Sequence, residues 1–256
     1  MAVTSIKFQE KFHQEPVFVG GFPGSGTRVI SRILSACDIF MGNHLNESNG
    51  SEYFNDFLNR WVPEFITTDY SRNDELCKEM EDEFLSCLCK HLEGITPDTR
   101  WGLKLSVNIL ILPLLHILFP AMKFIHILRD GRDLAASKKK RTSVRKYSLD
   151  LIGREIVSTA DMVELWRTIT LRGFEYGNEH LSENYLLIRF EDLCRMPDEV
   201  IRRISEFANS PLEDTRIAAR EVRPPSDAIG RWKHYHADFG NIPDRARTTL
   251  RRFGYE

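Results

Sequence analysis

Hydrophobic runs and amphipathic segments alternate along most of the chain. Short apolar runs predict buried strands at residues 16–20, 101–105, 123–128 and 185–190. Apolar residues at helical spacing predict helices from residue 27 onward and at 74–93, 108–119, 130–140, 154–176, 197–207 and 215–222. The polar stretch 42–70 predicts a loop that leads into a short helix. Strands alternating with helices are typical of a three-layer α/β fold, in which helices flank a central parallel sheet.

No segment of the chain has the composition of a domain boundary. The 256 residues contain no internal repeat, no low-complexity block and no linker rich in proline, glycine and serine. We therefore expect a single domain over residues 1–256. The formal net charge of −2 counts against a globally basic nucleic-acid-binding protein, so no nucleic-acid partner is expected.

Cysteine content and apolar segments indicate the compartment. Five cysteines are an odd number, which favours free thiols in a reducing compartment. The N-terminal residues lack the basic start and apolar core of a signal peptide. The longest apolar stretch, 109–122, is interrupted by two prolines and is too short to span a bilayer. The sequence thus predicts a cytoplasmic protein without a transmembrane segment, and it gives no indication of oligomeric state.

A glycine-rich turn, Gly21–Thr27, follows the first predicted strand and opens a helix. Backbone N–H groups at such a turn, with the positive end of the helix dipole, suit an anion such as phosphate. The dinucleotide pattern G-x-G-x-x-G fails because Val29 stands at its last glycine. The Walker pattern fits at Gly21 and Gly26, but Thr27 stands where its lysine belongs. The alternative is a tight turn without a ligand.

A second motif begins at the end of the third predicted strand. Arg129 offers a bidentate guanidinium there, and Ser137 offers a hydroxyl from within the following helix. Together the two could hold another phosphate. The alternative is a helix capped by Asp130 or Asp133, with Arg129 merely exposed.

These motifs resemble those of the sulfotransferase family that uses 3′-phosphoadenosine-5′-phosphosulfate (PAPS). Pro23–Thr27 resembles the family's P-x-S-G-T loop, and Arg129 with Ser137 resembles its later arginine–serine motif. Two further segments, 190–193 (F-E-D-L) and 230–233 (G-R-W-K), resemble family motifs in the expected order. The resemblance covers roughly residues 16–236 and implies a P-loop-like sulfotransferase architecture.

The resemblance also implies which residues bind the nucleotide. The loop would hold the 5′-phosphosulfate, and Arg129 and Ser137 would hold the 3′-phosphate. Phe190 would lie near the adenine, and the alternative is a plain core aromatic. Arg231 belongs to the segment that resembles the family's late motif. The expected cofactor-binding residues are therefore Pro23, Gly24, Ser25, Gly26, Thr27, Arg28, Arg129, Ser137, Phe190 and Arg231, and no metal is expected.

The chain departs from the family at two catalytic positions. Many relatives carry a lysine or arginine where Gly24 stands, so Arg28 or Lys104 could supply the missing charge. Cytosolic relatives place a catalytic histidine where Ser106 stands.

A different base is therefore needed. Other branches, including tyrosylprotein sulfotransferases, use a glutamate some twenty residues after the loop, which favours Glu47, with His44 as runner-up. The alternative is that both residues lie on a solvated loop.

The sequence therefore predicts a sulfotransferase that moves a sulfuryl group from PAPS to a hydroxyl or amine of a small-molecule or glycan acceptor. The nucleotide product would be adenosine 3′,5′-bisphosphate (PAP). Two rivals remain: a P-loop phosphotransferase that needs ATP and Mg²⁺, and a non-catalytic relative that binds PAP.

Overall fold

The computed structural model describes residues 8, 12–67, 74–137, 142–212, 214–222, 228–235 and 239–255. Its centre is a four-stranded sheet in the order β2-β1-β3-β4, and every adjacent pair is parallel. The strands are β1 (Val17–Gly20), β2 (Gly102–Lys104), β3 (Lys123–Leu128) and β4 (Tyr185–Arg189). All four overlap the predicted runs, so the predicted α/β fold with a parallel sheet is confirmed.

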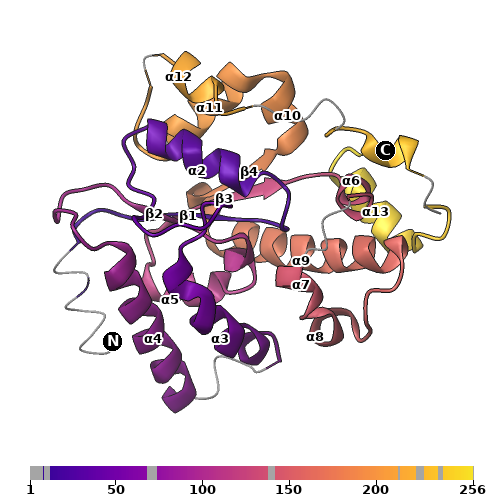
Figure 1. The fold of residues 1–256 in the computed structure, drawn as a ribbon, viewed down its shortest axis with the longest axis horizontal. Helices are drawn as coiled ribbons and strands as arrows, with labels where there is room; N and C mark the ends of the chain where they lie inside the picture. The colour runs from indigo at the N-terminus through magenta and orange to yellow at the C-terminus, as the bar shows by residue number, and fades with distance from the viewer. Residues whose placement is uncertain are drawn as a thin grey trace.

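Helices cover both faces of the sheet (Figure 1). One face carries α2 (Thr27–Ala36), α10 (Phe190–Arg195), α11 (Pro197–Phe207) and α12 (Arg216–Ala219). The other carries α3 (Asn55–Thr67), α4 (Asp74–His91), α5 (Leu112–Leu118) and α9 (Thr159–His180). The remaining helical segments are α6 (Gly131–Ala135), α7 (Thr142–Arg145), α8 (Ser148–Ile152), α13 (Asp244–Arg252), η1 (Glu52–Phe54), η3 (Ser106–Ile109), η4 (Ser182–Asn184) and η5 (Arg231–His234).

Alternation along the strands divides the hydrophobic core between these faces. In β1, Phe18 joins the cluster beneath α3, α4, α5 and α9, whereas Val17 and Val19 join the cluster beneath α2 and α11. Because successive side chains of a strand point to opposite faces, a fully apolar strand can bury both. None of the described helices has the length and apolar character needed to cross a membrane.

Several helix boundaries differ from the predicted ones. The predicted helix 108–119 is split into η3 and α5, because Pro113 lies at the start of α5, where its missing N–H costs no hydrogen bond. The predicted helix 154–176 begins only at Thr159, where Ser158 and Asp161 cap each other's backbone N–H groups. The predicted helix 130–140 ends at Ala135, and its last three residues lie outside the described part of the chain.

Asn108 ties two strands together beneath the carboxyl edge of the sheet. Its Nδ2 donates to the carbonyl of Val19 at 3.2 Å and to that of Leu103 at 3.1 Å. The side chain is fully buried, so water cannot replace it as a donor to these carbonyls. This amide therefore fixes the position of η3 against β1 and β2.

Asn108→Ala should lower the free energy of unfolding by about 2–3 kcal/mol, because it removes two buried donors. Urea denaturation measures the loss. The matched control is Asn178→Ala, which removes an exposed amide that also donates to a carbonyl, that of Phe174. Equal effects of the two substitutions would contradict the role assigned to Asn108.

Candidate active site

Four of the predicted site positions lie at the carboxyl ends of the four strands. The glycine-rich loop follows β1, Lys104 ends β2, Arg129 follows β3 and Phe190 follows β4. Since the strands are parallel and adjacent, these four positions share one edge of the sheet. Segments more than a hundred residues apart in the sequence thereby form one site.

The loop after β1 has the backbone of an anion-binding turn. Gly24 and Gly26 have φ angles of 93° and 109°, in the region that side chains disfavour. The N–H of Gly21 donates to the carbonyl of Ser106 at 3.1 Å, which holds the start of the loop. Helix α2 then begins without a side-chain cap and without an acidic residue in its first turn. The N–H of Val29 donates to the carbonyl of Gly26 at 2.9 Å, whereas the N–H groups of Thr27 and Arg28 precede the hydrogen-bond pattern of the helix and are positioned for an anion.

Arg129 joins the second motif to this loop. Its Nη1 donates to the carbonyl of Gly24 at 3.1 Å, and its Nη2 donates to the carbonyl of Ala228. The guanidinium carbon lies 4.7 Å from the centre of the Phe190 ring. The side chain is only 9% exposed, and its Nε has no hydrogen-bond partner among the described residues. A buried donor of this kind suits an anionic ligand. The interpretation of Arg129 as merely exposed is therefore wrong.

Phe190 forms a wall of the loop. The ring is 6% exposed and belongs to the core cluster that includes Ile127. A Cβ atom on Gly26 would lie 2.7 Å from its Cδ2 atom, so the ring edge contacts the loop backbone. Phe190 is thus a core aromatic that also lies directly beside the expected nucleotide-binding loop.

Ser137 does not lie within a helix, contrary to the prediction. Helix α6 ends at Ala135, and Ser137 occupies the turn that follows, where its N–H donates to the carbonyl of Leu134 at 3.3 Å. Asp130 caps α6 by accepting a hydrogen bond from the N–H of Arg132. This confirms the part of the alternative interpretation in which Asp130 caps the helix. A helix of five residues ends too early to include position 137.

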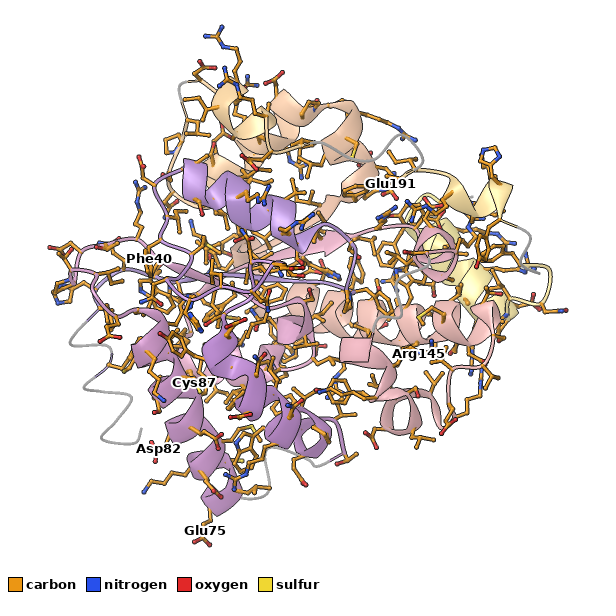
Figure 2. All side chains as sticks on the ribbon, in the orientation of Figure 1. Phe40, Glu75, Asp82, Cys87, Arg145 and Glu191 are labelled. Atoms are coloured by element: carbon orange, nitrogen blue, oxygen red, sulfur yellow. The ribbon has the colours of Figure 1, made fainter. Side chains whose placement is uncertain are left out.

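A carboxylate supports the turn that carries Arg129. Glu191 lies where α10 approaches α6 (Figure 2), and it is 2% exposed. Its Oε1 accepts from the N–H of Asp130 at 3.0 Å, and its Oε2 accepts from the hydroxyl of Tyr255 at 3.0 Å. Burial raises the pKa of Glu191. The turn after β3 is thus held from α10 and from the C-terminal segment.

Two hydroxyls and two cations lie on the β2 side of the loop. Thr27 Oγ1 and Ser106 Oγ are 3.1 Å apart and share a hydrogen bond. Lys104 is 3% exposed, and its Nζ donates to the carbonyl of Ser48 at 2.6 Å. Burial, and to a smaller degree the charge of Arg28, lowers the pKa of Lys104 to about 8. Both cations expected to replace the missing loop charge therefore lie within electrostatic range of each other.

The loop that carries the two candidate bases is connected to these cations. Exposed Arg28 donates through Nη1 to the backbone carbonyl of Glu47 at 3.3 Å, which brings this residue beside the first turn of α2. The Glu47 side chain is exposed. His44 is directed elsewhere: its Nε2 lies 2.8 Å from Oε2 of Glu52, and its ring is 5.3 Å from that of Tyr53.

Sequence reasoning missed the roles of Ser48 and Ser106. The sequence motif marks Ser106 only as the residue in place of a histidine, whereas in the structure its hydroxyl bonds Thr27 and its carbonyl accepts from the N–H of Gly21. Ser48 acts through its backbone carbonyl, which no residue pattern can reveal. The one sequence feature that points to Ser106 is its place at the position where cytosolic relatives have a catalytic histidine.

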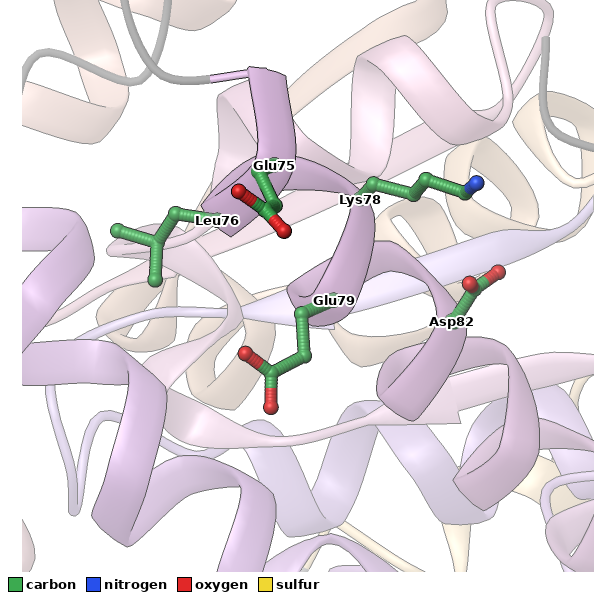
Figure 3. A pocket seen from close by; sticks show the side chains of 5 residues that line it. All are labelled: Glu75, Leu76, Lys78, Glu79 and Asp82. Atoms are coloured by element: carbon green, nitrogen blue, oxygen red, sulfur yellow. The ribbon is translucent and has the colours of Figure 1, made fainter.

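A separate hollow of about 570 Å³ lies along α4 (Figure 3). Among its lining residues three carboxylates stand against one ammonium, so it does not suit an anionic nucleotide. The lining residues are Glu75, Leu76, Lys78, Glu79 and Asp82.

Lys104→Met tests the cost of burying the Lys104 ammonium. The pKa is about 8 in the folded protein against 10.5 for a free lysine. Folding therefore disfavours the charged form fully below pH 8, and the penalty disappears as pH rises toward 10.5. After subtracting the lost hydrogen bond, we expect the variant to be more stable by about 1–2 kcal/mol near neutral pH, an advantage that fades at alkaline pH.

Urea denaturation across this pH range, with exposed Lys90→Met as the control, measures the difference. A Lys104→Met protein that is less stable than the wild type near neutral pH would contradict the expectation.

Comparison with known proteins agrees with this geometry. A Caenorhabditis briggsae protein named as a candidate protein-tyrosine sulfotransferase is 26% identical over 220 residues, which cover 82% of this chain and 70% of that protein. The sulfotransferase domain of the Synechococcus PCC 7002 olefin synthase superposes with a TM-score of 0.61 at 15% identity, over 95% of this chain and 97% of that one. Mouse sulfotransferase SULT7A1, solved in complex with PAP, superposes with a TM-score of 0.50 at 16% identity, over 98% of this chain and 87% of that one.

The solved structures share the fold of this chain, and the sequence profile described as "Sulfotransferase family" matches residues 16–214. That match covers most of the chain and includes three of the four sequence motifs, all except 230–233, so the protein belongs to the sulfotransferase family.

Proposed function

We propose that this sulfotransferase takes its sulfuryl group from PAPS and releases PAP. The observation that carries the proposal is the contact between the two motifs, in which Arg129 bonds the carbonyl of Gly24 while its buried Nε has no hydrogen-bond partner within the described segments. When bound, PAPS supplies the sulfuryl group together with a phosphate as its leaving group. The complex of SULT7A1 with PAP is consistent with this donor.

The residues around the loop fit the two ends of such a nucleotide. The backbone of Gly24–Thr27 and the Thr27 hydroxyl would hold the 5′-phosphate. Arg129, Ser137 and Arg231 would hold the 3′-phosphate, with Phe190 as the wall between the loop and Arg129. Burial is the main cause that lowers the pKa of Arg129, and coulombic repulsion from Arg231 lowers it further, which is consistent with two cations around one phosphate.

Lys104 and Arg28 would stabilise the charge that develops on the leaving phosphate. A buried ammonium interacts strongly with an anion because little water screens it. The stability cost of keeping Lys104 buried is therefore consistent with a catalytic role. These two residues would replace the cation that relatives carry at the position of Gly24.

Glu47 would accept the proton of the acceptor, and His44 is the alternative base. The assignment of Glu47 as the base is supported by the hydrogen bond from Arg28 to its backbone carbonyl. Arg28 is the second residue of α2, so this contact places Glu47 beside the glycine-rich loop. The acceptor would present a hydroxyl or amine on a small molecule or a glycan. The name of the C. briggsae relative adds the tyrosine hydroxyl of a protein as a further acceptor to test.

We further propose that residues 1–256 act as one domain in the cytoplasm. The core clusters on the two faces share a single sheet, which supports one folding unit. None of the five cysteines, all of which lie in the described part of the chain, forms a disulfide bond, which is consistent with a reducing compartment.

Isothermal titration with PAP tests the donor site directly. We expect the wild type to bind PAP and Arg129→Ala to bind it about 100-fold more weakly, because a charge-assisted bidentate contact is lost. Arg220→Ala, which removes an exposed arginine, is the control and should bind as the wild type does. Preference for ATP with Mg²⁺ over PAP would instead favour a phosphotransferase, and no binding of either nucleotide would overturn the proposal.

Transfer of radiolabelled sulfate from PAPS to a panel of phenols, alcohols, amines and tyrosine peptides tests the base. Glu47→Gln should lower kcat about 100-fold while PAP affinity stays unchanged, because proton transfer is lost and nucleotide contacts remain. His44→Gln and Glu52→Gln serve as comparisons, and both should retain most activity. Full activity of Glu47→Gln would exclude Glu47 as the base, and loss only in His44→Gln would assign the role to His44. PAP binding without transfer to any acceptor would favour a non-catalytic relative.

A further inference from the structure

The segment 228–235, which carries Arg231, is held against the helix that follows Arg129. Asp133 lies in α6 and is 1% exposed. Its Oδ2 accepts from the N–H of Gly230 at 2.8 Å, and its Oδ1 accepts from the N–H of Trp232 at 3.0 Å. The two clamped residues stand on either side of Arg231, so one carboxylate fixes the backbone that flanks this arginine.

Two further contacts join the same segment to the same stretch of chain. The guanidinium carbon of Arg132 lies 4.0 Å from the centre of the Trp232 ring, within the range of a cation–π contact. Arg132 is itself held by the carboxylate of Asp130, with Nη2 and Oδ2 2.9 Å apart. Arg129 reaches the carbonyl of Ala228 at the start of the segment. Residues 129–133 therefore bind both the phosphate loop and the segment 228–235.

We propose that Asp133 is a positioning residue, which sets the affinity for the donor nucleotide by docking the segment 228–235 so that Arg231 faces the same phosphate as Arg129. The inference rests on the proposed donor site. The physical reason is the burial of the carboxylate: with water excluded, the N–H groups of Gly230 and Trp232 are its partners, so the docked segment is strongly favoured over a displaced one. An asparagine cannot replace it, because its amide nitrogen would face one of the two N–H donors.

Tryptophan fluorescence reports the docking independently of any ligand. Of the four tryptophans, Trp61, Trp101 and Trp166 are at most 1% exposed, whereas Trp232 is half-buried in the segment itself. Acrylamide quenching of the accessible fraction therefore follows Trp232. We expect Asp133→Asn to increase this quenching, and Asp150→Asn, an exposed aspartate on α8, to leave it unchanged.

A double-mutant cycle on PAP affinity tests whether Asp133 acts through Arg231. Asp133→Asn should raise the Kd for PAP about tenfold in the wild-type background and less than about twofold in an Arg231→Ala background. In turnover assays the KM for PAPS should rise while kcat changes little. Gly230→Val provides a second route, since a β-branched residue at a φ of 75° strains the turn from outside the core. It should raise both the quenching and the Kd for PAP.

The outcomes separate this inference from the donor proposal. Failure of the wild type to bind PAP would overturn the donor site, and the inference with it. Wild-type binding with an unchanged Kd in Asp133→Asn, or an equal loss in both backgrounds, would overturn the role of Asp133 alone. If Asp133→Asn does not fold, Gly230→Val decides the question: unchanged PAP binding by this variant would overturn the proposed role of Asp133.

Discussion

The parallel pairing of β1 with both β2 and β3 is the constraint on which the site depends. Val19 pairs with Lys104 on one side and with Ile125 on the other, so the three chain segments leave the sheet along one edge. The loop after β1 thereby receives Lys104 and Ser106 from one neighbour and Arg129 from the other. Because the side chains of a strand alternate between faces, a shift of one residue in this pairing would turn Lys104 away from the loop.

Arg129 links this edge to the rest of the molecule. It bonds the loop and the segment 228–235 with its two terminal nitrogens, and it lies over Phe190. Burial lowers the pKa of its guanidinium, so the charge is held in a place that favours it less than water does. Lys104 on the other side of the loop is buried in the same way. Burial of the Arg129 and Lys104 charges therefore lowers the stability of the folded protein, and binding of an anionic ligand beside them would offset this cost. Such a compromise between stability and binding is common in active sites.

The turn after β3 is supported more heavily than its short helix would suggest. Glu191 holds the N–H of Asp130 and is itself held by Tyr255, while Asp133 clamps a segment about a hundred residues away. A five-residue helix has few hydrogen bonds of its own, so these distant contacts provide its rigidity.

The sequence by itself determined the strands, the glycine-rich turn, the arginine after β3 and the family to which the chain belongs. These depend on local properties, namely apolar runs, the backbone freedom of glycine and fixed short spacings, which survive without knowledge of the fold. The start of α9 could not be predicted as well, because the capping box of Ser158 and Asp161 sets it. Only the tertiary structure decided that Arg129 meets Gly24, that Ser106 meets Thr27 and that Asp133 holds both neighbours of Arg231. Each of these contacts joins residues 79 to 105 positions apart, and such pairs are set by the order of strands in the sheet and by the burial of polar groups, neither of which leaves a pattern in the sequence.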